Sequence, residues 1–221
     1  MSSSGGQTLI VGDVHGCADE FSRILEISGY HKNMRLVLVG DLIHKGPDSL
    51  GVLRLTESLG AEAVMGNHEL GFLRYLAKGG SFHAGFEQVR QQLGSECAKW
   101  ADYLRSLPLF IETEDWMVVH AGLEPGRHPS ETSAKILTRI RTWDGKGERL
   151  ERPGDPPWFD LYRGKQLVVF GHWARRGLVI RPNAIGLDTG CVYGQQLSAV
   201  LLPQRKIFQV PAKRVYQVPE T

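Results

Sequence analysis

The stretch LVLVGDLIHKGPDSL, residues 36–50, begins as a buried strand and then becomes a polar turn. Four apolar residues at 36–39 are followed by a glycine and then by Asp41. His44 and Lys45 stand just beyond, ahead of a Gly-Pro pair that turns the chain. A short apolar run of this composition predicts a β-strand. The strand therefore delivers a carboxylate at its tip, with an imidazole and an ammonium group close behind it.

The same arrangement occurs five times in the chain. Each occurrence is a short β-rich apolar run followed by residue types that bind metals, and in four of the five a glycine separates the two. This pattern directs attention to the strand ends as the place of a functional site. The polar segments are GDVHG (12–16), GD (40–41), GNHE (66–69), HAG (120–122) and GH (171–172).

Amphipathic helix signals lie between the early strands. Phe21, Ile24 and Leu25 follow helical spacing after an acidic first turn. Asp48 or Ser49 can cap a second helix. Strands that alternate with helices predict an α/β fold with largely parallel strand pairing in the front part of the chain.

The later part of the chain is predicted more coarsely. Residues 70–107 have helical patterns interrupted by glycines, which predicts two or three helices. The stretch 125–164 is rich in Gly, Pro and charge, which predicts loops over a site around a short helix at 132–142. The runs 197–202 and 206–210 predict a pair of antiparallel strands.

Length and composition indicate one soluble globular domain. The chain has 221 residues, of which 42% are hydrophobic and 23% charged, and its formal charge is +2. That charge is too small to favour nucleic acid or an anionic membrane as a partner, and no apolar run reaches the length of a membrane span. Residues 1–6 form a Ser/Gly tail, predicted to be disordered, without the features of a signal peptide. Three cysteines in no CxxC motif predict reduced thiols and a cytoplasmic location.

If the five runs belong to one sheet, the residues at their ends gather along one rim, because ligands bind at the carboxyl ends of strands in open α/β sheets. Each residue alone can be read as a turn or capping residue, but that reading does not explain five such strand ends in one chain. Oxygen and nitrogen ligands without thiolate suit Mn²⁺, Fe, Zn²⁺ or Co²⁺, and six ligands fit two ions that share a carboxylate. The residues expected at that rim are Asp13, His15, Asp41, Asn67, His68, His120 and His172.

These motifs resemble those of the calcineurin-like metallophosphoesterases, and GDVHG with GNHE resembles the phosphoprotein phosphatase branch. More narrowly, the chain resembles the bacterial symmetrical diadenosine tetraphosphatases, from about Leu9 to Val210. It is shorter than the larger enzymes of that group, by a segment expected between Glu69 and His120. The motifs that carry the narrower resemblance are GDVHGC, GDLxxxGPxSL, LTRIRTW (137–143), PPWF (156–159), FGHWA (170–174) and GLDTGCVYG (186–194).

The resemblance implies a four-layer α/β/β/α sandwich formed by a single domain, with residues 70–107 as a small cap-like helical insertion. It also implies two divalent metal ions, with Mn²⁺ as the first choice and Co²⁺, Fe or Zn²⁺ as alternatives. His68 would be the general acid that protonates the leaving oxygen. On the matching positions, one ion would be held by Asp13 and His15, the other by Asn67, His120 and His172, and Asp41 would bridge both.

The substrate side departs from the protein phosphatases, which carry Asp-Arg where this chain has His44-Lys45. Lys45 keeps the positive charge but lacks the planar fork that binds phosphate through two hydrogen bonds. Arg139 and Arg141 match the family's phosphate-binding segment, and on a regular helix at most one of them would face the site. The aromatic residues that could stack on adenine, although each also fits a packing role, are Tyr193, Trp143, Trp158 and Trp173.

These observations predict a metal-dependent hydrolase that cleaves diadenosine tetraphosphate symmetrically to two ADP, with other phosphoanhydrides and phosphomonoesters as further candidate substrates. The expected partner is a dinucleoside polyphosphate, and the sequence does not predict an oligomeric state. A serine/threonine or tyrosine protein phosphatase on the same two-metal site is the nearest alternative. A non-catalytic scaffold of the same fold is a third possibility, which the complete set of ligand residue types disfavours.

Overall fold

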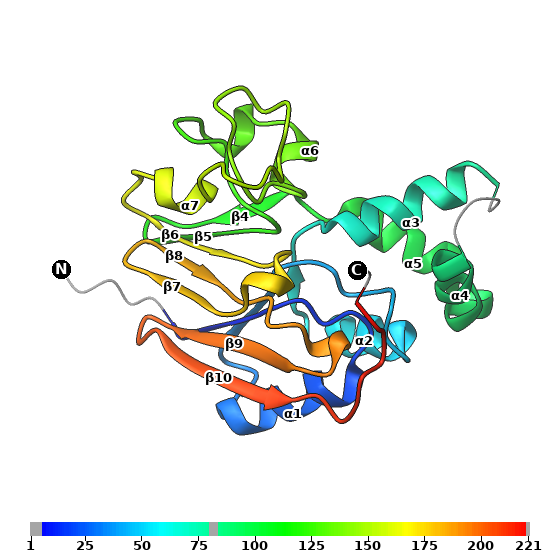
Figure 1. Ribbon diagram of the computed structural model, residues 1–221. Helices are drawn as coiled ribbons and strands as arrows, with labels where there is room; N and C mark the ends of the chain where they lie inside the picture. The colour runs from blue at the N-terminus through cyan, green and yellow to red at the C-terminus, as the bar shows by residue number, and fades with distance from the viewer. Residues whose placement is uncertain (1–5, 80–83, 220–221) are drawn as a thin grey trace.

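Two five-stranded β-sheets packed face to face form the centre of the protein, in a computed structural model that describes residues 6–79 and 84–219. Figure 1 shows the layers in order: loops with two short helices, one sheet, the second sheet, and a pair of longer helices. The predicted four-layer α/β/β/α sandwich is confirmed. The disordered tail predicted at residues 1–6 lies outside the described residues, apart from Gly6.

The first sheet joins three N-terminal strands to a C-terminal hairpin. Its strands, in the order in which they lie side by side, are β10 (Lys206–Pro211), β9 (Gln196–Leu202), β1 (Thr8–Val11), β2 (Arg35–Leu38) and β3 (Glu62–Ala63). The pairs β1–β2 and β2–β3 are parallel, because a helix returns the chain across the sheet after each of the first two strands. The predicted antiparallel pair β9–β10 is confirmed.

The second sheet is assembled from the middle of the chain. Its strands, again in spatial order, are β4 (Phe110–Glu112), β5 (Trp116–Val119), β6 (Leu167–Phe170), β8 (Ala184–Gly186) and β7 (Val179–Arg181). The central pairs β5–β6 and β6–β8 are parallel. The condition that all five motif-bearing runs share one sheet is not met, because β1, β2 and β3 lie in the first sheet and β5 and β6 in the second.

The apolar runs are continuous because both faces of these strands are buried. In β2, Leu36 and Leu38 pack with the cluster under the outer helices, whereas the alternate residue Val37 packs between the sheets. Val118 of β5 and Val169 of β6 belong to the same cluster between the sheets. Packing therefore fixes the strand register on both faces, so that the residue after each strand has a defined position at the sheet edge.

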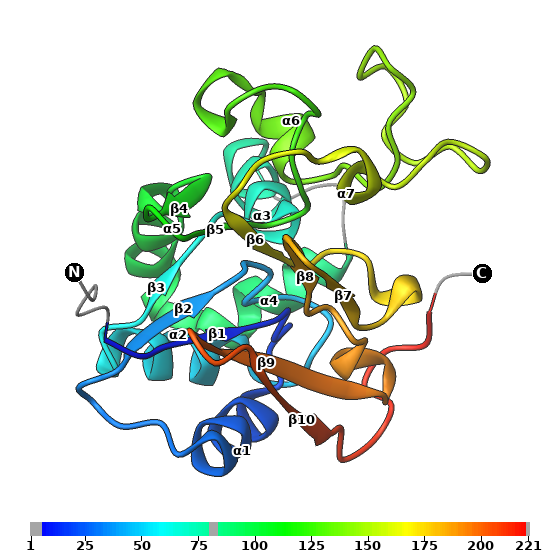
Figure 2. The ribbon, with the colours of Figure 1, turned by 90° about the vertical axis from the view of Figure 1, so that its left-hand side faces the viewer.

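Two helices cover the outer face of the first sheet, as Figure 2 shows below the strands. They are α1 (Ala18–Ser28) and α2 (Ser49–Ser58). The apolar stripe predicted for the first helix is buried, with Phe21 and Ile24 fully inaccessible. Asp48 caps the second helix as expected, because its carboxylate accepts a hydrogen bond from the Gly51 amide at 2.7 Å, a contact that stabilises a helix by about 1 kcal/mol.

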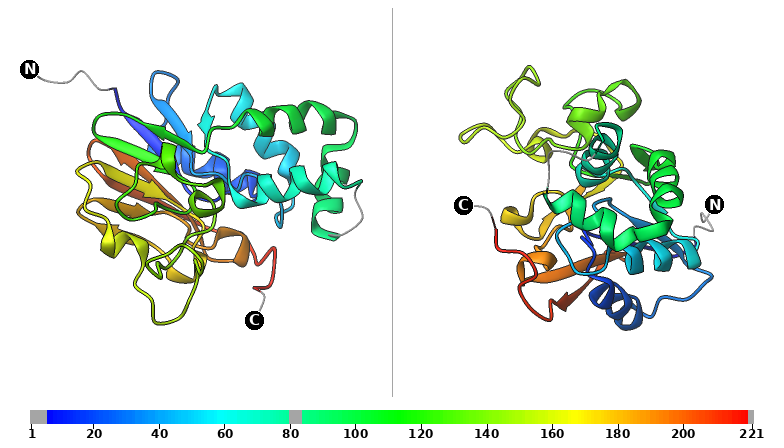
Figure 3. Two further views of the ribbon diagram at one scale, coloured as in Figure 1. Left: turned by 90° about the horizontal axis from the view of Figure 1, so that it is seen from above. Right: turned by 90° about the vertical axis from the view of Figure 1, so that its right-hand side faces the viewer.

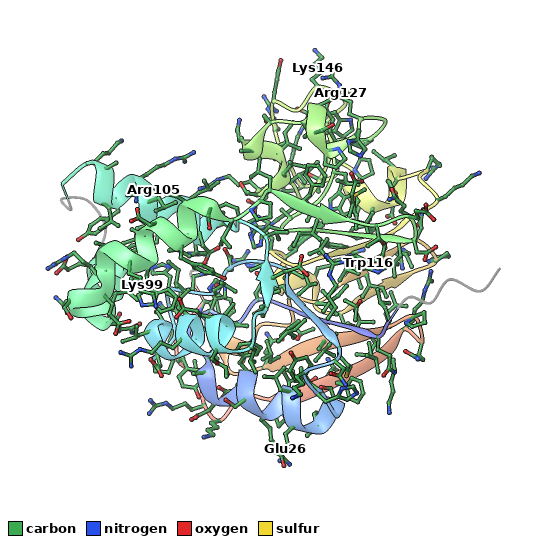
Figure 4. The ribbon with its side chains drawn as sticks, turned by 180° about the vertical axis from the view of Figure 1, so that it is seen from behind. Glu26, Lys99, Arg105, Trp116, Arg127 and Lys146 are labelled. Carbon is green, nitrogen blue, oxygen red and sulfur yellow. The ribbon has the colours of Figure 1, made fainter. Side chains whose placement is uncertain are left out.

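The opposite outer layer consists mainly of loops. Its two short helices are α6 (Ala134–Leu137) and α7 (Trp158–Leu161). The helix predicted at 132–142 is thus confined to its first half: Ser133 caps it, and the chain leaves helical geometry after Leu137. Figure 4 shows Arg127 and Lys146 at the outer reach of these loops.

Three helices form a group at one side of the two sheets, as the left view in Figure 3 shows. They are α3 (Asn67–Ala77), α4 (Ala84–Leu93) and α5 (Cys97–Ser106), which agrees with the two or three helices predicted for this segment. Their shared core includes the fully buried Phe72 and Trp100. That the segment is a cap-like insertion within a single domain stays a prediction. None of the helices described is long and apolar enough to cross a membrane.

Candidate active site

The carboxyl ends of the motif-bearing strands from both sheets meet at one edge of the sandwich. Figure 1 shows β1 running from the side marked N toward the side where α3 and α5 lie. The backbone amide of His172, after β6, donates to the carboxylate of Asp13, after β1, at 3.0 Å. His120 Nδ1, after β5, lies 2.8 Å from the carbonyl oxygen of Val39, after β2. The two sheets are therefore joined at this edge by the polar residues that follow their strands.

Asp41 stands at the centre of the group. Its Oδ2 lies 3.4 Å from His120 Nε2, 3.6 Å from His15 Nε2 and 3.8 Å from His68 Nε2. These imidazoles come from the ends of three other strands and approach the same carboxylate oxygen. The other oxygen, Oδ1, accepts a hydrogen bond from the His68 amide at 3.0 Å. This is the arrangement expected of a carboxylate that serves two neighbouring sites.

Asn67 connects the two histidines of the second sheet. Its Oδ1 lies 2.9 Å from His120 Nε2 and 2.8 Å from His172 Nδ1. The structure thus brings together all seven residues that the sequence placed at the rim, although from two sheets. The contacts link Asp13, His15, Asp41, Asn67, His68, His120 and His172 into one continuous cluster.

The backbone around this cluster is held in an uncommon conformation. Among the described residues, six that are not glycine have a positive φ, and five of these six belong to the site segments. Residues other than glycine rarely adopt this region, although Asn, Asp and His do so more often than the rest, and its concentration here points to a functional site. The five are His15, Asp41, His44, Lys45 and His172, with φ between 48° and 76°.

Two glycines allow the close packing that the carboxylates require. A Cβ atom on Gly171 would lie 1.9 Å from Asp13 Oδ1, and one on Gly66 would lie 2.2 Å from Asp41 Oδ1. Neither approach leaves room for a side chain. The glycine that separates strand from ligand in these two motifs is therefore needed to let a carboxylate from another strand come against the backbone.

Glu69 supports the cluster from behind. It is fully buried, and its two carboxylate oxygens accept hydrogen bonds from the amides of Asp41 and Leu42 at 2.9 Å each and from the Gly66 amide at 3.0 Å. These bonds tie the β2 tip to the start of α3 in a capping box. Burial and the nearby Asp41 raise the pKa of Glu69 to about 7. The sequence analysis did not single out this residue, although it ends the GNHE motif.

The charges of His120 and of the neighbouring carboxylates shift one another's pKa values. Burial alone would lower the pKa of His120, but Asp41 and Asp13 raise it to about 10. Burial would likewise raise the pKa of Asp41, but His120 and His68 bring it well below its usual value. His15 behaves differently, because burial lowers its pKa to about 3. Without a metal ion, the two carboxylates therefore favour the protonated form of His120.

The substrate-side candidates lie at the rim of the same cluster. Lys45 Nζ donates to the Tyr193 hydroxyl at 2.7 Å. Arg141 and Arg139 both lower the pKa of His172, with Arg141 the stronger of the two, after the effects of burial and His120. The helical restriction on these arginines does not apply, because both follow the end of α6. The Nε of Arg141 is buried and has no hydrogen-bond partner among the described residues.

The aromatic candidates fall into two groups. Trp158 is fully buried, packs on Phe170 and donates from Nε1 to the carbonyl of Ala121 at 3.0 Å, so it belongs to the core and cannot stack on a base. Trp143 and Trp173 are partly exposed and pack against the same core. Tyr193, the fourth candidate, contacts Lys45 through its hydroxyl.

Comparison with known proteins decides the family. Residues 6–176 match the family model described as calcineurin-like phosphoesterase. The chain belongs to the calcineurin-like phosphoesterases. A protein of Dechloromonas aromatica named symmetrical bis(5'-nucleosyl)-tetraphosphatase is 34% identical over 272 positions, which cover 96% of this chain and 98% of that protein. One of Nitrosomonas europaea with the same name is 32% identical, with 94% and 99% covered. Because 272 positions exceed the 221 residues here, the first relative carries additional segments.

Solved structures support the same family. A crystal structure assigned to a diadenosine tetraphosphatase superposes on this phosphoesterase with a TM-score of 0.85 at 38% identity, and the match covers 96% of both chains. The cold-active protein-tyrosine phosphatase of a Shewanella species superposes with a TM-score of 0.60 at 15% identity. The second comparison shows a shared fold and nothing more specific.

Calcineurin-like phosphoesterases are metal enzymes, and the donor atoms of this chain fit divalent ions. Of the three groups of potential ligand atoms found among the described residues, each with its atoms within 4.8 Å of one another, two lie at this site and share Asp41. A pair of ions that shares a bridging carboxylate requires this geometry, and the mixed nitrogen and oxygen donors suit transition metals. The groups are His15, Asp41 and His68, and Asp41, His120 and His172.

Asp188 is a further buried residue of the phosphoesterase site that the sequence analysis did not assign. Burial raises its pKa to about 6, and it in turn contributes to the raised pKa of Asp13. Its carboxylate accepts a hydrogen bond from the Gly190 amide at 3.1 Å. The signal was present, because the apolar strand β8 is followed by Leu187 and then by this aspartate, in the pattern of the other strands.

Proposed function

We propose that this chain is a dinuclear-metal hydrolase that cleaves diadenosine tetraphosphate symmetrically to two ADP. The observation that carries the proposal is the central position of Asp41 between two groups of ligand atoms, in a chain similar almost from end to end to proteins named symmetrical bis(5'-nucleosyl)-tetraphosphatase. Other phosphoanhydrides and phosphomonoesters are further candidate substrates, because the same attack on phosphorus serves them.

The contacts around Asp41 support the assignment of metal ligands. Mn²⁺ is the ion we propose first, with Co²⁺, Fe or Zn²⁺ as alternatives that the same donors accept. Bound at this place, two ions would activate water and neutralise charge on the phosphoryl group that is attacked. In this assignment Asp13 and His15 hold one ion, Asn67, His120 and His172 hold the other, and Asp41 is shared.

The positively charged side chains around the cluster are proposed to bind the polyphosphate. Lys45, Arg139 and Arg141 surround the cluster closely enough to alter the pKa values of its histidines. Arg141 has a buried Nε that finds no partner among the described residues, which makes it the first candidate to donate to a phosphate oxygen. Another nitrogen of the same guanidinium, Nη1, forms an ion pair with Glu151, so a phosphate would compete with that carboxylate for the fork that Lys45 lacks.

His68 is proposed as the general acid. Its Nε2 faces Asp41 Oδ2, on the proposed bridging carboxylate, at 3.8 Å. A proton carried on this nitrogen would pass to the oxygen of the departing ADP, and the N–H bond would break as the new O–H bond forms. The same nitrogen also lies within the first ligand group, so metal analysis of a variant is needed to separate the two roles.

The protein phosphatase alternative rests on the fold alone. The likeness to the tyrosine phosphatase is at 15% identity, and the pair His44-Lys45 replaces the Asp-Arg pair of the protein phosphatases. The scaffold alternative has less support, because the residue types needed for metal binding are all present and in contact. The free thiols of Cys17, Cys97 and Cys191 agree with the cytoplasmic location that the sequence predicts.

Chromatography of reaction products tests the proposal. The protein is reconstituted with Mn²⁺ and incubated with diadenosine tetraphosphate, and ADP as the sole product is the expected result. Asp41→Asn, which keeps the shape of the side chain, should abolish the reaction, whereas the matched change Asp160→Asn on the surface should leave it intact. Formation of AMP with ATP, or clear hydrolysis of a phosphopeptide with no cleavage of the dinucleotide, would overturn the proposal.

A further inference from the structure

His44 and His68 form a side-chain pair beside the metal cluster. Their Nδ1 atoms lie 2.6 Å apart, and their ring centroids are separated by 4.7 Å with an interplanar angle of 31°. His44 is buried, with 7% of its surface accessible. Because the histidines are 24 residues apart in the sequence, the contact is produced by the fold and is not a local turn.

A hydrogen bond between two Nδ1 atoms has only one proton, so one ring must donate and the other accept. When His68 donates its Nδ1–H, the accepting His44 carries its own proton on Nε2. The other nitrogen of His68, Nε2, is then the one directed toward Asp41 and the reacting groups. The bond to His44 at Nδ1 therefore leaves Nε2 of His68 as the nitrogen directed toward Asp41.

Helix α4 holds His44 in this position. The Phe86 ring packs on the imidazole with a centroid distance of 4.6 Å and an angle of 39°. The preceding residue, Gly85, lies so close that a Cβ atom there would be 2.3 Å from His44 Nε2. On the other side, the His44 amide donates to the Ser49 hydroxyl at 3.2 Å. The His44 imidazole is thus held between the Phe86 ring and the backbone of α4 at Gly85, on a residue whose φ is positive.

We propose that His44 is a positioning residue that orients His68 for proton transfer, in the place where protein phosphatases use an aspartate. A neutral imidazole nitrogen accepts the Nδ1–H of His68 without placing a second negative charge next to Asp41. During the reaction the Nε2–H bond of His68 breaks and its proton forms the O–H bond of the leaving group. The Nδ1–H bond stays intact and continues to donate to His44. This inference rests on the proposed acid role of His68.

A double-mutant cycle separates this role from a general effect on folding. His44→Ala removes the acceptor, and His44→Asn keeps an acceptor oxygen near the position of Nδ1 in a residue that tolerates positive φ. We expect His44→Ala to lower kcat roughly 10- to 100-fold, a part of the effect of a general acid, with KM within about twofold. His44→Asn should recover most of the loss, and metal content should be the same in all variants.

In the background of His68→Asn, the change His44→Ala should have no further effect on kcat, because the residue through which it acts is gone. Equal losses in both backgrounds would overturn the proposal, and so would an Asn variant as impaired as the Ala variant. The cycle is run with both diadenosine tetraphosphate and p-nitrophenyl phosphate. If only the second is cleaved, the substrate assignment fails while the cycle still decides the role of His44.

The tautomer of His68 gives a readout that does not depend on activity. Histidine side-chain ¹⁵N NMR of the metal-free protein should show His68 with its proton on Nδ1, and His44→Ala should shift it toward a mixture of both forms. A wild-type His68 protonated on Nε2 and accepting at Nδ1 would contradict the proposed direction of the bond. A protein without activity on either substrate would remove the acid role of His68, and the inference would fall with it.

Discussion

The Lys45 ammonium donates a hydrogen bond to the Tyr193 hydroxyl at 2.7 Å across a separation of 148 residues. The same ammonium lies 5.1 Å from the centroid of the Tyr193 ring. Lys45 leaves the β2 tip in the first sheet, and Tyr193 belongs to the 3₁₀ turn Cys191–Tyr193 that precedes β9. The tyrosine therefore limits the freedom of a long side chain that would otherwise sample many positions near the phosphates.

Removing the hydroxyl should release Lys45 without removing its charge. We expect Tyr193→Phe to raise KM for diadenosine tetraphosphate about two- to fivefold with little change in kcat, because one neutral-to-charged hydrogen bond is lost from ground-state orientation. Steady-state kinetics with the Mn²⁺ protein measures both constants. An unchanged KM would show that the tyrosine does not orient the lysine during binding.

Loss of the Lys45 charge should have a larger effect. Lys45→Ala is expected to lower kcat/KM roughly 100-fold, the effect of deleting one group that stabilises developing charge. The matched control is Lys99→Ala on α5, an exposed lysine that is labelled in Figure 4 and pairs with Glu57 at 2.7 Å. Equal kinetics for the two variants would remove Lys45 from the site.

His68→Asn should separate proton transfer from metal binding. Turnover is expected to fall by about 10²- to 10⁴-fold, as for removal of a general acid, while the metal content of the purified protein stays near that of wild type. Metal analysis by mass spectrometry and kinetics on the same sample provide the test. Full activity would exclude the acid role, and loss of metal along with activity would reassign His68 as a ligand.

Glu69 is expected to contribute strongly to the stability of the fold. Glu69→Ala leaves the buried amides of Asp41, Leu42 and Gly66 without an acceptor. The free energy of unfolding should fall by roughly 3 kcal/mol or more, measured by urea denaturation of the metal-free protein. Glu57→Ala, at an exposed surface ion pair, should change it by less than about 1 kcal/mol. Similar losses for both variants would contradict the supporting role of Glu69.

Metal binding should release protons, because the pKa of His120 is raised to about 10 in the metal-free cluster. At pH 7.5 His120 is protonated and must lose its proton to become a ligand, so about one proton per chain should be released on adding Mn²⁺. As the pH falls below 10, protonation competes more strongly, and the apparent affinity should weaken by up to tenfold per pH unit. Titration in a weakly buffered dye solution measures the release; its absence would contradict a metal-free His120 that carries a proton at this pH.

The sequence was sufficient to find most of the ligand cluster. Asp41 and His120 each follow an apolar run, and the residue types at those positions are informative without knowledge of the fold. The same rule extended to β8 would have identified Asp188. It could not show that the strands divide between two sheets, because a strand buried on both faces has the same composition in either arrangement.

Contacts between distant segments could not be predicted from the sequence, for a physical reason. The pairing of His44 with His68 depends on α4, which places Gly85 and Phe86 against the imidazole. No local sequence pattern predicts that a helix packs against His44. The shortness of α6 is a similar case, since the Arg141 amide leaves helical geometry to donate to the carbonyl of Leu150 at 2.7 Å.

The most direct test of the central claim is mass spectrometry of the products formed in H₂¹⁸O. The Mn²⁺ protein is incubated with diadenosine tetraphosphate in labelled water, and the nucleotides are separated and weighed. Attack at an inner phosphorus with cleavage of the central anhydride predicts ADP alone, half of the molecules carrying a single ¹⁸O. AMP and ATP as products, or no cleavage at all under conditions in which p-nitrophenyl phosphate is hydrolysed, would contradict the assignment of this chain as a symmetrical tetraphosphatase.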